Sequence, residues 1–566
     1  MKSMTNGWLR HSLAFAAALV AVGFAAPVWA AFELPEGERI TNVPHIPRAI
    51  PQKEAYENYD PKIGKNFDVK NFWMRADLRV RPEYRKNTCF GSANGAAGAC
   101  NAAGSATGSS AIAGKPANDF YVQQWVRLGI GYDLSPDVNF YMEIIDAAVW
   151  GGNGSQLNAG NGGDPLNHAC GNGSAASAAG SSANCRLGVR AAYVLVRNLG
   201  DVQGLSMKAG RQYVIFGNHS LFGHFDWANT GYSHDGIMFQ YATKNFESHL
   251  GWFRNSETDL VQGSPVGSGA ANPVGTAQGS TAGGDADMII FYNQIKSVPG
   301  FLIEPYYVFY KNAMGSADNR AQGLGTAKHS NQIRHMVGNR IEMRKGNWDA
   351  INETVYQFGS MGDGVGVNST GGSTSFNTEN RNLHINAWAM RNWLGYTHYQ
   401  SSMKPRIAIN LDYASGDSKA NCTLATGYGP CESANTFENF FPTNHIHMGY
   451  ADVQAWKNMM TPAFNFQFRP TKNDHFEFWF NNFNLANKGD NYYRAGQGVY
   501  VFSKIGNQKT HVADEYDVTW THMFADGKVS LQATYALVKA GGYLKENLSS
   551  GALNQHWGFV QLWMNF

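Results

Sequence analysis

The stretch Phe72–Arg85 constrains this chain most, because its side chains alternate between apolar and ionic along FWMRADLRVRPEYR. Residues two apart lie on nearly opposite sides of a helix but on one face of a strand, so the alternation predicts a strand. Its length suits a strand that is tilted across a bilayer, which takes about 9–11 residues. The apolar face would contact lipid and the ionic face would need water. The pattern therefore predicts a transmembrane β-barrel with a basic lumen.

Both ends of the chain favour the same location. Residues 1–30 are typical of a cleaved signal peptide, with Lys2 and Arg10 before the apolar run Ser12–Phe24 and a small-residue site at Ala30. The last residues, WGFVQLWMNF, form an apolar row when counted back by twos from Phe566, which resembles the terminal signature of bacterial outer-membrane barrels. We therefore expect the outer membrane of a Gram-negative bacterium.

Alternating segments recur along the rest of the chain, and the connections between them are by turns long and short. We expect a single closed antiparallel all-β barrel of about 18 strands over residues 69–566, with short periplasmic turns and long extracellular loops. A polar periplasmic extension, residues 31–68, would precede it. A count of sixteen stays open, because Gly236–Tyr241 and the stretch around Thr461 alternate weakly. We expect one domain, since closure removes exposed sheet edges, and a monomer.

The six cysteines fall as three pairs, each inside one predicted long loop. An oxidising envelope favours disulfides, and a bridge that closes a loop of about 15 residues contributes roughly 3 kcal/mol in the chain-entropy account. The expected bridges are Cys89–Cys100, Cys170–Cys185 and Cys422–Cys431, although six cysteines allow other pairings.

Charge patterning nominates the residues that line the lumen. The chain has 45 basic and 43 acidic residues, and without the signal peptide the two numbers are equal, which gives no case for nucleic-acid binding. A lipid-facing arginine at mid-bilayer costs roughly 2–4 kcal/mol, so arginines on strands should face inward. By parity, the basic lumen residues are Arg75, Arg79, Arg81, Arg85, Arg127, Arg190, Lys208, Arg334, Arg340, Arg344 and Arg406. The acidic ones are Asp77, Glu83, Glu143, Glu342, Glu353, Asp412, Glu515 and Asp517.

These lumen charges have two interpretations. Guanidinium groups bind carboxylates bidentately, which would make the lumen a conduit for anions. Alternatively, each arginine neutralises a neighbouring acid and the ladder only holds the barrel in shape. The first strand has four arginines for two acids, so we expect some anion preference.

Other chemistry has little support in the sequence. His445 and His447 could share a strand face, and the histidines at 219, 224 and 234 could cluster, but none has the cysteine or carboxylate spacing of a metal site. No nucleophile or phosphate-loop motif is present. We therefore expect no metal, no cofactor and no enzymatic activity.

Several segments resemble the alginate-export porin family. They are QQWVRLGIGYDLSPDVNFYMEIIDAAVWGG (123–152), AGRQYVIFGNHSLFGHFDWANTGYSHDGIMFQY (209–241), YASGD (413–417) and FENFFPTNHIHMGYAD (437–452). The resemblance implies an 18-stranded barrel with an arginine-rich pore and passive export of an acidic polysaccharide such as alginate. It adds Arg211 to the pore-lining residues. It also implies loop-anchoring roles for Asp226, Asp235, Asp417 and His445.

The expected function is a passive channel that favours anionic or saccharide solutes. Its partners would be outer-membrane lipid, the diffusing solute and, if one exists, a periplasmic protein. One alternative is a barrel that sheathes a periplasmic electron-transfer cytochrome. Another is an outer-membrane hydrolase.

Overall fold

The computed structural model describes residues 71–91, 117–150, 187–228, 231–256, 286–312, 332–362, 382–418, 433–495, 499–501, 503–504, 506–548 and 552–565. The predicted signal peptide and periplasmic extension lie outside these ranges. So do the side chains of all six cysteines, and the three expected disulfides therefore stay predictions. Within the described residues, no helix is long and apolar enough to cross a membrane.

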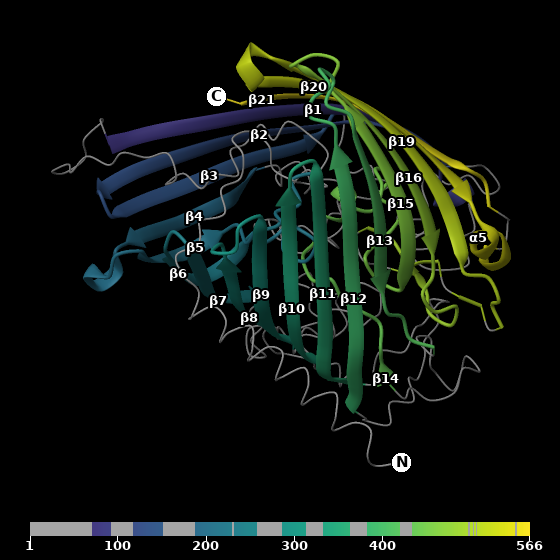
Figure 1. The fold of residues 1–566 in the computed structure, drawn as a ribbon, viewed down its shortest axis with the longest axis horizontal. Coiled ribbons are helices and arrows are strands. Elements are labelled where there is room, and N and C mark those ends of the chain that lie inside the picture. Colours follow the sequence, from purple (N-terminus) through teal and green to yellow (C-terminus); the bar gives the residue numbers. More distant parts are fainter. Residues whose placement is uncertain are drawn as a thin grey trace, which may run out of the picture.

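Eighteen strands form one antiparallel barrel. They are β1 (Phe72–Thr88), β2 (Ala117–Ser135), β3 (Val138–Val149), β4 (Leu187–Arg197), β5 (Leu205–Gln212), β6 (His234–Ala242), β7 (Phe246–Ser256), β8 (Ala286–Ile295), β9 (Phe301–Asn312), β10 (Gln332–Lys345), β11 (Trp348–Gly362), β12 (Asn382–Thr397), β13 (Arg406–Ala414), β15 (Met459–Phe468), β16 (Asp474–Asn484), β19 (His511–Phe524), β20 (Val529–Ala540) and β21 (Gln555–Asn565). Each pairs with the next, and β1 also pairs with β21, so the sheet closes on itself (Figure 1).

Several short elements lie between the barrel strands. They are β14 (Ser433–Ala434), which pairs in parallel with β12, the small ribbon of β17 (Tyr492–Tyr493) and β18 (Val499–Val501), the helix α5 (Gly542–Asn547), and the 3₁₀ turns η3 (Cys89–Gly91), η7 (Leu199–Asp201), η9 (Asn444–Ile446) and η10 (Ala525–Gly527).

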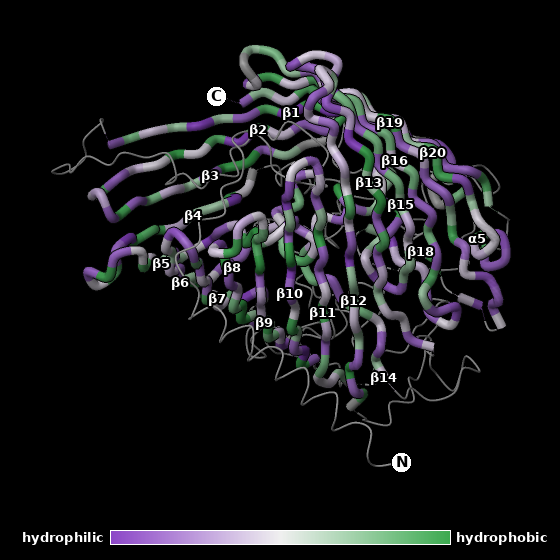
Figure 2. Tube along the Cα trace, in the orientation of Figure 1, coloured by the Kyte–Doolittle hydropathy of each residue, from purple (hydrophilic) through white to green (hydrophobic). Residues whose placement is uncertain are grey.

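The predicted fold class and strand parity are confirmed. On β1, Met74 is 59% exposed on the outer surface, whereas Arg79 and Arg81 on the other face are each 1% exposed. Polar and apolar residues alternate in the same way along other strands of the barrel (Figure 2). The alternative of sixteen strands is wrong, because both weakly alternating stretches form full members of the barrel, β6 and β15.

Two long connections turn back into the barrel and fill part of its interior. The first inward segment, residues 213–228, follows β5, and the second inward segment, residues 435–458, follows β13. They pair with each other where Gly223 N–H donates to the carbonyl of Phe441 at 2.8 Å and Phe441 N–H donates to that of Leu221 at 3.0 Å. Trp227 and Tyr450 are buried in one apolar cluster against the strands, and Phe222 and Trp456 in another. The interior of the barrel thus contains a packed core.

Candidate functional site

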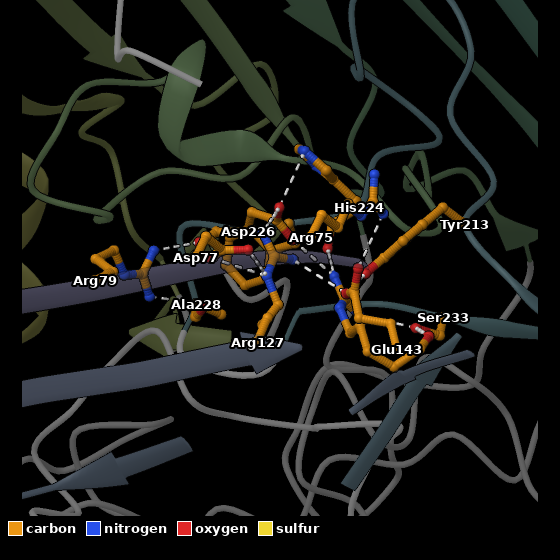
Figure 3. A network of polar contacts seen from close by, with 12 residues as sticks. Arg75, Asp77, Arg79, Arg127, Glu143, Tyr213, His224, Asp226, Ala228 and Ser233 are labelled. Carbon is orange, nitrogen blue, oxygen red and sulfur yellow. Dashed lines mark hydrogen bonds and ion pairs between the residues drawn. The ribbon is translucent and has the colours of Figure 1, made fainter. Parts of the chain in front are cut away.

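Six arginines project into the interior from neighbouring strands and form a basic wall. They are Arg75, Arg79, Arg81 and Arg85 on β1, Arg127 on β2 and Arg190 on β4. The register places Asp77 of β1 opposite Arg127 of β2, so acid and base meet across the sheet. Five of the six are almost fully buried, and the side chain of Arg75, toward the short-turn end, is 19% exposed. Figure 3 shows the centre of this wall.

Arg127 is the hub of the ion pairs on the basic wall. Its guanidinium lies 3.1 Å from Asp77, 3.1 Å from Asp226 and 3.7 Å from Glu143 (Figure 3). Arg190 approaches the other oxygen of Asp226 at 2.8 Å. Burial alone would raise the pKa of Asp226, but Arg127, His224 and Arg190 outweigh it and hold the pKa well below its usual range. Asp226 is therefore ionised and fixes the first inward segment to the wall.

The basic wall also holds the backbone of the first inward segment through its carbonyl oxygens. Arg79 donates to the carbonyls of Asp226 and Ala228, and Arg81 donates to that of Trp227 at 2.9 Å. Arg190 donates to the carbonyl of His224 at 2.7 Å. A guanidinium carries five donors, so each of these arginines can bind a carboxylate or an aromatic ring and a carbonyl together.

A stack of three planar groups joins the wall to both inward segments. The guanidinium of Arg81 lies 3.5 Å from the ring centre of Trp227, and the imidazole of His445 lies 3.7 Å from the other side at 3° to the indole. Asp452 accepts from Trp227 Nε1 at 2.8 Å and lies 2.8 Å from His445 Nδ1. Burial lowers the pKa of His445 in spite of Asp452, so the imidazole is neutral at pH 7.

An acidic wall on β16 and β19 holds the second inward segment. It consists of Glu477, Glu515 and Asp517. Glu515 accepts from the backbone N–H of Ala451 at 2.8 Å, and Asp517 accepts from that of Tyr450 at 3.3 Å. Glu477 accepts from the hydroxyl of Tyr450 at 3.0 Å.

One glycine permits this approach of the second inward segment to the acidic wall. Gly449 has φ +81°, which favours glycine, and a Cβ there would lie 2.4 Å from a carboxylate oxygen of Glu515.

Further inward charges lie on β9–β13 and are largely paired with one another. Arg340 contacts Glu304 and Glu342, and Arg406 lies 2.6 Å from Asp349. The remaining predicted lumen residues also lie on inward faces: Arg334 donates to Gln357, Lys208 lies over the ring of Tyr193, Glu353 accepts from Tyr306, and Arg344 is half-buried beside the turn after β10.

Arg391 on β12 is an inward arginine that was not among the predicted lumen residues. It is fully buried, lies 3.0 Å from Asp412 and donates to the hydroxyl of Ser220 at 2.6 Å. The inward row around it is apolar, Ala387, Ala389 and Trp393, because it packs against the inward segments, so parity gave no signal there. The weak alternation of β12 was the available clue.

Two predicted site residues lie on the wrong side of the barrel for their expected roles. Arg211, expected to line the pore, and Asp235, expected to anchor a loop, face each other across β5 and β6 on the outer surface, 2.9 Å apart. The reason is parity, since Arg211 is three residues from Lys208, and an odd separation places two strand residues on opposite faces. Asp417 does contact a loop, because it accepts from the backbone N–H of Asn435 at 2.8 Å.

The histidines of the inward segments do not assemble with acids or cysteines in the manner of a metal centre. Across the described ranges, no group of three or more histidine, cysteine, aspartate or glutamate side chains is placed to hold a metal ion. His219 and His224 pack edge to face at 5.1 Å, and His447 bonds to the carbonyl of Asn218.

Comparison with protein-family models identifies the family of this chain. The family model described as alginate export matches residues 166–557, more than half of the sequence. The chain belongs to the alginate export family. Membership of an export family together with the closed barrel identifies the chain as an outer-membrane channel of a Gram-negative bacterium.

Two solved structures are similar in outline. Acinetobacter baumannii OccAB2 matches with a TM-score of 0.47 and 9% identity, over 87% of this chain and 98% of that one. Pseudomonas aeruginosa OccK8 (OprE) matches with a TM-score of 0.44 and 10% identity, over 87% of this chain and 98% of that one. A search among curated proteins finds no significant match.

Proposed function

We propose that this channel passes anionic solutes passively, with acidic polysaccharides such as alginate among them. The observation that carries the proposal is the surplus of cations on the basic wall, where six arginines share five carboxylates, Asp77, Glu83, Glu143, Asp226 and Asp452. A cation surplus in a low-dielectric channel raises the local concentration of anions.

The half-buried bases near the short-turn end support the same proposal. Arg75, Arg344 and Arg406 are less buried than the arginines of the outer half, and short turns are periplasmic in such barrels. An anion that enters from the periplasm would meet these three side chains before it reaches the inward segments.

The test is the reversal potential of the purified channel in a planar bilayer under a salt gradient. We expect the wild type to favour anions and the triple variant Arg75→Gln, Arg344→Gln, Arg406→Gln to have a permeability ratio closer to one. Arg211→Gln is the matched control, because it removes a charge from the outer surface and should leave the ratio unchanged. A cation-selective wild type, or a triple variant with unchanged selectivity, would overturn the proposal.

A second measurement addresses the substrate. Oligomers of alginate should interrupt the ionic current at lower concentration than neutral oligosaccharides of equal length, because only the former carry carboxylates for the guanidinium groups. Equal interruption by both would remove acidic polysaccharide from the proposal and leave a channel for small anions.

We propose that the chain acts alone and without an enzymatic step. A barrel that sheathes a cytochrome must admit a second protein, but the two inward segments already pack against both walls. No contact in the described residues favours that alternative.

A further inference from the structure

A row of charged side chains crosses the outer surface of five neighbouring strands, β5 to β9. The sheet register pairs Arg211 with Asp235, Asp235 with Arg254, Arg254 with Asp287, and Asp287 with Lys311. Paired residues project from the same face of a sheet. We call these five residues the outer charged row.

The face that carries this row is the lipid-facing one. On β6, β7 and β8, the residues two positions from the row are Ile237, Trp252 and Ile289. The residues four positions from it are Phe239, Leu250 and Phe291. All but Ile237 are more than a third exposed on the outer surface, which is an apolar band of the kind that contacts hydrocarbon.

The row lies at the ends of the strands that lead into the long connections. Charges are tolerated on the outer wall near the interfaces of a bilayer far better than at its centre. Since the long loops of such barrels are extracellular, the row lies at the level of the headgroups of the outer leaflet.

The charged side chains of the row are held in place by contacts with one another and with a tryptophan ring. Arg211 lies 2.9 Å from Asp235, and Arg254 lies 2.8 Å from Asp287. Trp252 Nε1 donates to Asp287 at 3.2 Å, and its ring lies 5.8 Å from the Arg254 guanidinium. These contacts hold the arginine side chains against the wall, while Asp235 keeps 56% of its side chain exposed.

The three bases occupy every second strand. Neighbouring strands are about 4.8 Å apart, so Arg211, Arg254 and Lys311 repeat at intervals of roughly 10 Å along the barrel surface. With three cations for two carboxylates, the row has a net positive charge. Guanidinium and ammonium groups both bind phosphate, and guanidinium does so bidentately.

We propose that the outer charged row binds the phosphates of the outer-leaflet glycolipid, the lipid A headgroup of lipopolysaccharide. The complementary charge, the depth on the wall and the apolar band beneath for acyl chains all fit this ligand. The site is separate from the lumen and does not depend on the proposed transport function.

The test uses the full-length protein in detergent micelles, with diphosphorylated lipid A as the probe and native mass spectrometry to count bound lipid. The variant is Arg211→Gln, Arg254→Gln, Lys311→Gln. We expect it to bind lipid A roughly 10- to 100-fold more weakly, the scale of basic residues at an anionic membrane surface. Asp235→Asn with Asp287→Asn should bind more tightly than wild type, because the row then carries three positive charges.

Matched controls separate the row from charge in general. Lys86 and Lys539 are exposed bases on the outer surface elsewhere around the barrel. Lys86→Gln with Lys539→Gln should bind lipid A like the wild type. Phosphatidylglycerol, which is anionic but lacks the phosphorylated disaccharide, should bind more weakly than lipid A.

Several results would overturn the proposal. The triple variant could bind lipid A as well as the wild type does, the lysine control could lose as much binding, or phosphatidylglycerol could bind as tightly as lipid A. The wild type could also form a dimer that the triple variant lacks while it still binds lipid A, which would make the row a protein interface. If the triple variant does not fold, as judged by its electrophoretic shift on heating, Lys311→Gln alone carries the test with an expected loss of about fivefold.

Discussion

The basic wall and the acidic wall hold the inward segments of the same barrel, but they bind opposite ends of the peptide group. Arginines on β1 and β4 donate to backbone carbonyls of residues 224–228. Carboxylates on β19 accept from backbone N–H groups of Tyr450 and Ala451. A segment that enters a barrel cannot form a sheet with the wall on every side, so its backbone groups need side-chain partners.

The two walls differ in how far they depend on charge. On the basic wall, Arg127 compensates Asp77 and shares Asp226 with Arg190, so the removal of Arg127 leaves the buried Asp77 without this counter-ion. On the acidic wall, the described contacts of Glu515 and Asp517 with the second inward segment come from neutral N–H donors. An uncharged acceptor of the same shape could satisfy those donors.

The largest effect should follow from Arg127→Ala on the basic wall. It leaves Asp77 and Asp226 buried without their main cation, which costs about 3–5 kcal/mol for pairs of this kind. Urea unfolding in detergent micelles, followed by tryptophan fluorescence, measures the change. Arg127→Lys is the matched variant and should retain part of the stability. A loss below about 1 kcal/mol for the alanine variant would contradict a charge-dependent basic wall.

A pH-dependent effect of similar size should come from Asp490, which lies in the connection after β16. Its carboxylate accepts from the backbone N–H of Asp417 at 2.8 Å and from the hydroxyls of Thr436 and Tyr493, and its burial raises the pKa to about 6. The folded protein therefore binds this proton at a higher pH than the unfolded chain does. The free energy of unfolding should fall by about 3 kcal/mol on account of this group as the pH rises from about 3 to about 7.

Asp490→Asn provides the control for that slope. Other carboxyl groups also titrate in this range, so the quantity to compare is the difference in unfolding free energy between wild type and variant at each pH. If the difference is constant from pH 4 to pH 7, the assignment to Asp490 is wrong.

A smaller effect is expected for Glu515 on the acidic wall. Glu515→Ala leaves the N–H of Ala451 without its acceptor and should cost about 1–3 kcal/mol. Glu515→Gln keeps an acceptor oxygen and should stay within about 0.5 kcal/mol of the wild type. A loss for the glutamine variant as large as that for alanine would show that the acidic wall also depends on charge. Urea unfolding in detergent micelles, followed by tryptophan fluorescence, measures both variants.

The smallest effect is expected outside both walls, at the pair of Arg254 and Asp287 on the outer surface. Their side chains are 31% and 18% exposed, so Arg254→Gln should change the unfolding free energy by about 0–1 kcal/mol. The unfolding free energy measured at low and at high salt gives the contribution of this pair, since salt screens an exposed ion pair more than a buried one. A change larger than that of Glu515→Ala would break the distinction between interior and surface pairs.

Much of the barrel could be predicted because strand formation in a membrane is encoded locally. The alternation in Phe72–Arg85 predicted β1 and its inward arginines, and the same period located the remaining seventeen strands. Arg391 was not predicted as a lumen residue because the inward row of its strand is apolar. Arg211 was assigned to the pore by resemblance, although parity would have placed it on the outer surface of the barrel.

The sequence by itself determined the barrel and which side of the wall most charges face, because a lipid-exposed surface imposes a period of two on every strand. The tertiary structure decided between eighteen strands and sixteen, because β6 and β15 pair with neighbours on both sides. Only the tertiary structure decided what the inward charges do. Arg79 and Arg81 bind carbonyls of residues about 150 positions away, and Glu515 binds an N–H some 64 positions earlier, distances at which no local pattern exists. Those contacts arise because residues 213–228 and 435–458 turn inward and bring polar backbone that the two walls satisfy.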